Sequence, residues 1–134
     1  MSSVSIKGIV LGSLFDLVAT FAFTFALGIF LSVQHGGDAE ATMLALCSAE
    51  WMTVTIVVTS VFTVVAGYLA AWIAGRGEVI NGTLSAVLST AIALLMSIGQ
   101  PSPWPGAVMV MLFILTPLLG LLGGYLRSRQ VNAG

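Results

Sequence analysis

Four uninterrupted apolar segments dominate this chain of 134 residues and limit what it can fold into. Each segment is near or above the ~20 residues that an α-helix needs to cross a hydrocarbon core about 30 Å thick. A lone strand cannot satisfy its backbone hydrogen bonds in lipid, so we expect each segment to be helical. The segments cover residues 8–33, 51–74, 79–98 and 106–126.

The composition is typical of a chain that is solvated by lipid. Hydrophobic residues make up 58% of the sequence and charged residues 7%, whereas about 25% of a soluble domain is charged. We therefore predict an all-α integral membrane protein, a four-helix bundle that forms a single transmembrane domain over residues 1–134. The net charge of −1 indicates no attraction to nucleic acid, and we expect the lipid bilayer to be the main partner.

The connections between the segments differ in length and in turn chemistry. The first loop, 34–50, carries Asp38, which is suited to cap a short helix over residues 39–46 that lies at the membrane interface. Residues 75–78 form a tight turn, so we expect the second and third helices to be antiparallel neighbours. The last loop, 99–105, is rich in proline and is expected to be extended.

The charges predict an orientation in the membrane. Every lysine and arginine falls on one side of the predicted bundle, at Lys7, Arg76, Arg127 and Arg129, and the other side carries Asp38, Glu40 and Glu50. Because basic residues favour the cytoplasmic side, we expect both termini and the turn 75–78 to be cytoplasmic and the loops 34–50 and 99–105 to be outside. The expected location is the inner (plasma) membrane of a bacterial-type cell.

Small and hydroxyl-bearing residues recur at four-residue spacing on all four predicted helices. In lipid, such residues let helix backbones approach closely and form hydrogen bonds between helices. We interpret these stripes as packing surfaces within the bundle, and a polar groove or a docking face for a partner helix is the functional alternative. The residues assigned to packing are Gly12, Thr24, Gly28, Thr59, Thr63, Gly67, Ser85, Ser89, Gly120 and Gly124.

Asp16 lies about two turns into the first predicted helix. An ionised carboxylate at mid-membrane costs about 2.5–3.5 kcal/mol on insertion scales, so we expect its side chain to face the bundle and to find partners there. Thr20 and Asn81 are candidate partners, beside other hydroxyls of the neighbouring helices. Two hypotheses stay open, a proton- or cation-binding site and a structural carboxyl group that ties helices together.

Motifs for covalent chemistry are missing from the sequence. It contains no phosphate-binding glycine loop, no nucleophile elbow and no paired acidic metal site, so we expect neither an enzyme nor a cofactor or metal. The leading hypothesis is a non-enzymatic accessory or interaction subunit that binds another membrane protein or forms a homo-oligomer. The alternative is a small proton- or cation-coupled transporter or channel that uses Asp16.

The stretch AGYLAAWIAGR at residues 66–76 is followed by NGTL at residues 81–84. This pattern resembles a group of small uncharacterised bacterial four-helix inner-membrane proteins, which share a Gly-Tyr-x-Ala-Ala-x-x-Ala-Gly helix end, a short basic turn and a next helix that opens with a glycine. The match covers the second and third predicted helices. The resemblance implies a fold and no activity.

Overall fold

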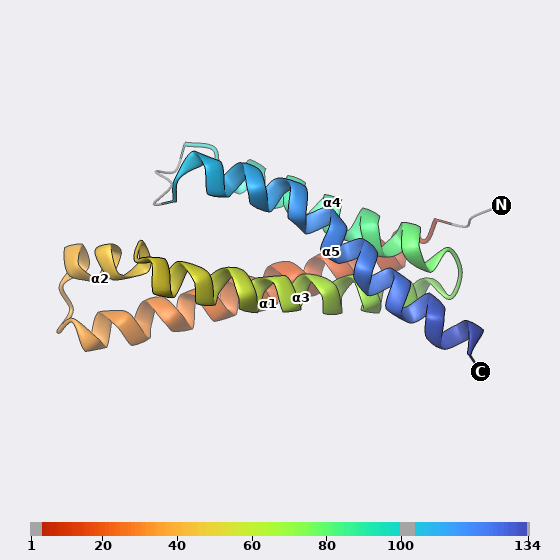
Figure 1. Cartoon of the computed structure of the whole chain (residues 1–134), viewed down its shortest axis with the longest axis horizontal. Coiled ribbons are helices and arrows are strands. Elements are labelled where there is room, and N and C mark those ends of the chain that lie inside the picture. Colours follow the sequence, from red (N-terminus) through yellow and green to blue (C-terminus); the bar gives the residue numbers. More distant parts are fainter. Residues whose placement is uncertain (1–3, 100–103, 134) are drawn as a thin grey trace.

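The computed structural model describes residues 4–99 and 104–133, and these residues form an all-α bundle (Figure 1). Four long apolar helices pack together, as the sequence predicted, and a short fifth helix follows the first of them along the chain. The helices are α1 (Ile6–Gln34), α2 (Ala39–Leu46), α3 (Ala49–Ala74), α4 (Glu78–Ser97) and α5 (Gly106–Asn132).

Local sequence signals set several of the helix ends. The Asp38 carboxylate accepts hydrogen bonds from the backbone N–H groups of Glu40 and Ala41, at 2.9 and 3.1 Å, and so caps α2 as predicted. Gly75 ends α3 in a left-handed conformation with φ of 64°, which glycine adopts without a steric penalty. The helix α5 continues past the apolar segment to Asn132, because apolarity marks where a helix leaves lipid and not where its hydrogen bonds end.

The long helices form two crossing pairs, α1 with α3 and α4 with α5 (Figure 1). The pairs meet where α3 contacts α4, α1 contacts α4, and α5 contacts α3. Among the described residues, no Cα atom of α1 lies within 8 Å of a Cα atom of α5. In cross-section the bundle is therefore a rhombus, with α3 and α4 on its short diagonal.

The two pairs pack tightly in the half of the bundle where both chain ends lie (Figure 1). The buried residues of α4 fall between Asn81 and Ser89, and those of α5 between Gly120 and Gly124. A Cβ atom added at Gly67 of α3 would lie 2.5 Å from the carbonyl oxygen of Gly120, so the helix backbones touch there. Toward the end that carries α2, the two pairs diverge (Figure 1).

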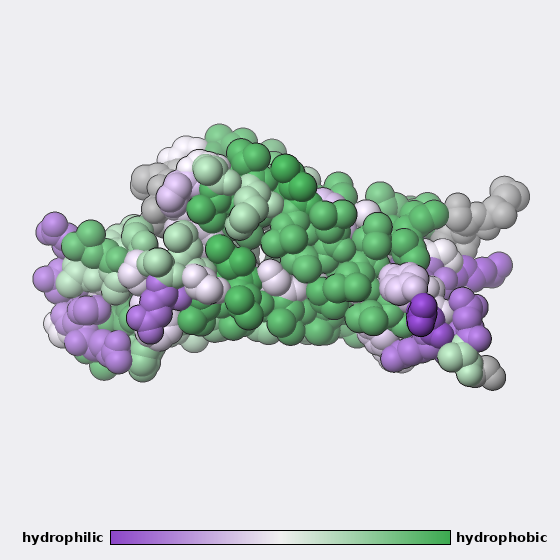
Figure 2. All heavy atoms as spheres, in the orientation of Figure 1, coloured by the Kyte–Doolittle hydropathy of each residue, from purple (hydrophilic) through white to green (hydrophobic). Residues whose placement is uncertain are grey.

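The outer surface of the bundle is apolar between two polar ends (Figure 2). In the most apolar 18-residue window of each long helix, only 11% to 28% of the residues are buried inside the chain. The remaining apolar surface needs an apolar solvent, which a bilayer provides. By length and composition, α1, α3, α4 and α5 are the four candidate spans of a multi-pass membrane protein.

Candidate functional site: a buried carboxyl group at the end of a threonine-lined cavity

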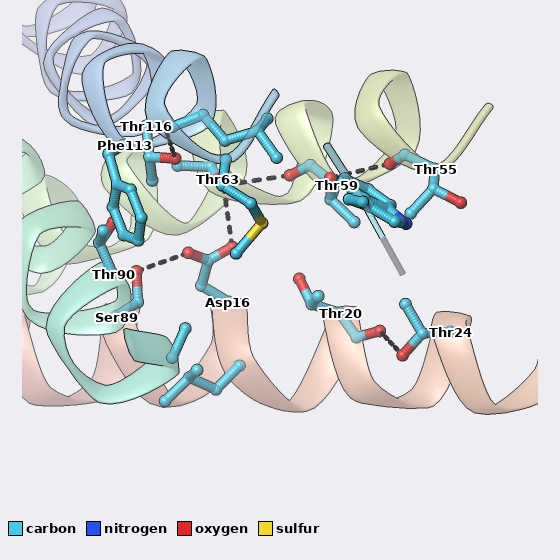
Figure 3. A pocket seen from close by; sticks show the side chains of 15 residues that line it. Asp16, Thr20, Thr24, Thr55, Thr59, Thr63, Ser89, Thr90, Phe113 and Thr116 are labelled. Carbon is cyan, nitrogen blue, oxygen red and sulfur yellow. Dashed lines mark hydrogen bonds between the residues drawn. The ribbon is translucent and has the colours of Figure 1, made fainter. Parts of the chain in front are cut away.

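The carboxyl group of Asp16 is held between three of the long helices. Its side chain extends from α1 and is 6% exposed. The Thr63 hydroxyl of α3 donates a hydrogen bond to Oδ1 at 3.1 Å, and the Ser89 hydroxyl of α4 donates one to Oδ2 at 2.7 Å (Figure 3). Each carboxyl oxygen thus has a partner on a different helix, and Asp16 joins α1, α3 and α4 at one point.

Both hydroxyl partners of Asp16 have a second acceptor within reach. Thr63 Oγ1 lies 3.1 Å from the carbonyl oxygen of Thr59, and Ser89 Oγ lies 3.1 Å from the carbonyl oxygen of Ala86. A hydroxyl group has a single hydrogen, so at any moment it donates either to the carboxyl group or to the carbonyl of its own helix. The site therefore contains two alternative hydrogen-bond arrangements.

A cavity of about 280 Å³ reaches Asp16 from the diverging half of the bundle (Figure 3). All four long helices contribute to its lining, and none of the described residues that line it is Lys, Arg or His. Apolar and aromatic side chains, among them Leu112, Phe113 and Trp104, cover much of the wall. The polar lining consists of Asp16, Thr20 and Thr24 from α1, Thr55, Thr59 and Thr63 from α3, Ser89 and Thr90 from α4, and Thr116 from α5.

The threonine hydroxyls determine which sign of charge this cavity wall favours. Five of their hydroxyls donate to the carbonyl four residues earlier in the same helix, at 2.7 to 2.9 Å. Because that bond uses the only hydrogen of each hydroxyl, the oxygen keeps lone pairs that can accept a hydrogen bond or approach a cation. A wall of acceptors that ends at a carboxyl group favours positive charge over negative charge. The five residues are Thr24, Thr55, Thr59, Thr90 and Thr116.

Close helix packing closes the cavity on the side of the chain ends. A Cβ atom added at Gly12, one turn before Asp16, would lie 2.6 Å from Ser85 Oγ, 2.7 Å from the Ala70 side chain and 2.8 Å from the Ala66 carbonyl oxygen. Real Cβ atoms do not approach other atoms so closely, so only glycine fits at this position. The cavity therefore ends at Asp16 and extends from there into the half of the bundle that carries α2.

The structure brings most of the candidate residues to this cavity but separates Asn81 from it. The described partners of Asn81 are the backbone N–H of Ser5 and the carbonyl oxygens of Arg76 and Gly77, at 2.7 to 2.9 Å, and Asp16 is not among them. Asn81 and Ser89 are eight residues apart on α4, which is about 12 Å along the helix. Asn81 thus ties the start of α1 to the α3–α4 turn and is not a ligand of the carboxyl group.

The residues assigned to packing fall into three groups. Gly12, Gly67, Gly120 and Gly124 lie at close backbone contacts, and Ser85 is fully buried beside Gly12. Thr24 and Thr59 line the cavity, and Thr63 and Ser89 bind the carboxyl group. Gly28 belongs to none of these groups, because a Cβ atom added there would meet nothing within 4 Å. Gly28 therefore makes no close helix contact among the described residues.

Several cavity residues were not singled out from the sequence. Thr90 follows Ser89 directly, and one residue is about 100° around a helix, so a four-residue stripe through Ser89 passes it by. Phe113 and Trp104 carry no polar signal that distinguishes them from the apolar residues around them. In the sequence, only the adjacent hydroxyl residues Ser89 and Thr90 in an otherwise apolar helix indicated this part of the cavity wall.

Comparison of the chain with protein families, with curated proteins and with solved structures finds no match.

Proposed function

We propose that this multi-pass membrane protein is a small transporter or channel that moves a proton or another small cation, with Asp16 as its binding group. The observation that carries the proposal is the cavity that ends at this buried carboxyl group. An ionisable residue at membrane depth is costly, and such residues commonly mark ion and proton pathways. A carboxyl group with a purely structural role would not need a cavity beside it.

The arrangement of the cavity supports cation binding over anion binding. Its polar groups are hydroxyl oxygens with unused lone pairs and one carboxyl group, and the described lining contains no basic side chain. Apolar residues fill the rest of the wall, so charges inside interact more strongly than they would in water. A cation that enters from the α2 end therefore meets increasingly favourable electrostatics until it reaches Asp16.

The proposal includes an orientation in the membrane. Lys7, Arg76, Arg127 and Arg129 belong to the half of the chain ends, where we place the cytoplasm, and the acidic residues of α2 and of the start of α3 belong to the opposite half. By the positive-inside rule, the cavity then opens away from the cytoplasm. The compartment that we propose is the inner (plasma) membrane of a bacterial-type cell.

Replacement of the carboxyl group tests the transport proposal. The purified full-length protein is reconstituted in liposomes, and flux of protons and of monovalent cations is measured under an imposed gradient. We expect Asp16→Asn to reduce the flux at least tenfold, because the amide has a similar size but cannot ionise. Flux that persists unchanged in Asp16→Asn, or that is missing in the parent protein, would contradict the proposal.

A matched variant controls for effects on folding and on surface charge. Glu50→Gln makes the same chemical change at an exposed position in the first turn of α3. We expect its flux to equal that of the parent. Both variants should keep the helical circular dichroism spectrum and the monodisperse elution of the parent, so that a loss of flux in Asp16→Asn reports on the site and not on misfolding.

A second candidate function is that of an accessory or interaction subunit without covalent chemistry. It is favoured by the diverging half of the bundle, where Leu95, Met96 and Ile114 are 57% to 68% exposed. A partner helix that packs against these side chains would cover them. Native mass spectrometry from a mild detergent tests this function, because a partner chain or a second copy must co-purify if it is correct, whereas a monomer alone would count against it.

A further inference from the structure

The hydrogen bonds around Asp16 indicate which small cation the site takes. We propose that Asp16 binds and releases a proton, and that the hydroxyls of Thr63 and Ser89 change their acceptors as it does so. This inference rests on the proposed transport function and names the ligand of that same site. The inference is based on four distances. Two join the hydroxyls of Thr63 and Ser89 to the carboxyl oxygens of Asp16, and two join the same hydroxyls to backbone carbonyl oxygens.

The ionised form of Asp16 is satisfied by the bonds described above. Thr63 donates to Oδ1 and Ser89 donates to Oδ2, so each oxygen of the carboxylate accepts a hydrogen bond from a neutral donor. Such charge-assisted bonds are stronger than those between neutral groups. They come from two helices other than α1, so the charge is stabilised by the assembled bundle and not by its own helix.

The protonated form is satisfied by the same heavy atoms. When a proton binds Oδ2, the carboxyl group becomes a donor to Ser89 Oγ at the same 2.7 Å. The Ser89 hydrogen then turns to the carbonyl oxygen of Ala86, 3.1 Å away, which also accepts a hydrogen bond from the Thr90 hydroxyl at 2.7 Å. One proton enters and one hydroxyl rotates, and no buried polar group loses its partner, a loss that would be costly.

The same exchange is available at the other oxygen of the carboxyl group. A proton on Oδ1 is donated to Thr63 Oγ1 at 3.1 Å, and the Thr63 hydrogen turns to the carbonyl oxygen of Thr59, also at 3.1 Å. Both oxygens can therefore take up a proton by the rotation of one neighbouring hydroxyl. Backbone carbonyls that already belong to α3 and α4 act as the alternative acceptors.

A metal ion fits this arrangement less well than a proton does. Hard metal cations bind several oxygen ligands at once, roughly six to eight in the case of Ca²⁺. Oδ2 and Ser89 Oγ are 2.7 Å apart, so these two oxygens are engaged in a hydrogen bond with each other. Within residues 4–99 and 104–133, no group of three or more His, Cys, Asp or Glu side chains could hold a metal ion.

An infrared titration of the full-length protein in lipid nanodiscs tests the ligand. The protonated carboxyl group of Asp16 should give a C=O stretching band that grows as the pH falls and is missing in Asp16→Asn. We expect the midpoint of this titration to be the same in sodium, potassium and lithium salts at equal ionic strength. A midpoint that moves with the concentration of one of these cations would overturn the inference, and so would the lack of any such band over the pH range in which the protein stays folded.

Three hydroxyl variants test the exchange of acceptors. Thr63→Val and Ser89→Ala each remove a hydroxyl that contacts the carboxyl group, so each should shift the frequency of its C=O band. Thr83→Val is the matched control, because its hydroxyl donates to the carbonyl of Val79 in α4 and does not line the cavity. An unchanged frequency in the first two variants, or an equal shift in Thr83→Val, would overturn the exchange.

The infrared titration does not require transport. Its result can therefore separate a failure of the proton-site proposal from a failure of the transport proposal. A titration that is independent of metal cations, in a protein without flux in liposomes, would leave the proton site standing and remove the transport function. A midpoint that depends on sodium or potassium, together with flux that requires Asp16, would keep the transport function and replace the proton with a metal cation.

Discussion

Ser13 and Ser85 face each other where α1 meets α4, and their hydroxyls are in opposite situations. The Ser13 hydroxyl lies 2.8 Å from the carbonyl oxygen of Ser85 and 2.8 Å from that of Ile9 in its own helix, so it can donate to either and link the two helices. The Ser85 side chain is fully buried, and among the described residues its hydroxyl has no hydrogen-bond partner. At the scale of single residues, the same chemical group therefore stabilises the bundle at one position and not at the other.

Two alanine variants should show this difference as opposite changes in stability. Ser13→Ala removes a hydrogen bond between helices and should lower the free energy of unfolding by about 0.6 kcal/mol, the average measured for such bonds in membranes, and by no more than about 1.7 kcal/mol, the largest value measured. Ser85→Ala removes a buried hydroxyl without a partner and should leave the free energy of unfolding unchanged or raise it. Unfolding in mixed micelles, followed by circular dichroism, gives both values.

A loss of stability in Ser85→Ala as large as that in Ser13→Ala would contradict this assignment. It would mean that the Ser85 hydroxyl has a partner in the membrane, such as a bound water molecule. The comparison is well matched, because both changes delete one oxygen atom from a serine that is at most 2% exposed.

At the scale of helices, the contact between α3 and α5 depends on glycine. A Cβ atom at Gly67 would lie 2.5 to 3.1 Å from three backbone atoms of Gly120, which cannot rotate away as a side chain can. We expect Gly67→Ala to push the helices apart and to lower the free energy of unfolding by about 1 to 3 kcal/mol, as overpacked cores do. Thermal unfolding in detergent checks this value.

Gly28→Ala is the matched control for that substitution. Gly28 lies inside α1 with open space where a Cβ atom would be. Alanine is the better helix former by about 0.5 to 1 kcal/mol, so this variant should be as stable as the parent or more stable. Equal destabilisation by Gly28→Ala and Gly67→Ala would show that the α3–α5 contact is not specific.

The number of long helices follows from the sequence because a membrane span requires about 20 apolar residues, and four segments of the chain meet this condition. The cap of α2 by Asp38 also follows, because a cap depends only on neighbouring residues. The roles of the stripe residues do not follow in this way. Residues four apart on a helix rotate steadily around its axis, so one stripe passes from a helix contact at Gly12 to a cavity wall at Thr20.

The partners of Asp16 depend on contacts that are distant in the sequence. Thr63 and Ser89 are 47 and 73 residues away from it, and only the crossing of the helices brings them together. Asn81 was expected at the same place because it is a polar residue of a neighbouring helix. Its position near the start of α4 instead brings it to the turn after α3, where its amide binds backbone groups.

At the scale of the whole molecule, the bundle is asymmetric from end to end. The half with the chain ends is closed by glycine and alanine contacts, and the half with α2 contains the cavity. A carrier must at some stage expose its binding group to the opposite side, so one pair of helices would have to pivot on the other. The touching backbones near Gly67 and Gly120 are where such a pivot would lie.

The orientation of this asymmetric bundle decides toward which side of the membrane the cavity half lies, and one cysteine makes it measurable. Cys47 is exposed and lies between α2 and α3, at the end opposite both chain ends. The positive-inside rule places it outside the cell, so a membrane-impermeant maleimide should label the protein in intact cells. The double variant Cys47→Ala, Ser128→Cys moves the thiol to the opposite end and should be labelled only after the membrane is permeabilised. Labelling of the double variant alone in intact cells would reverse the orientation, and the cavity would then open to the cytoplasm.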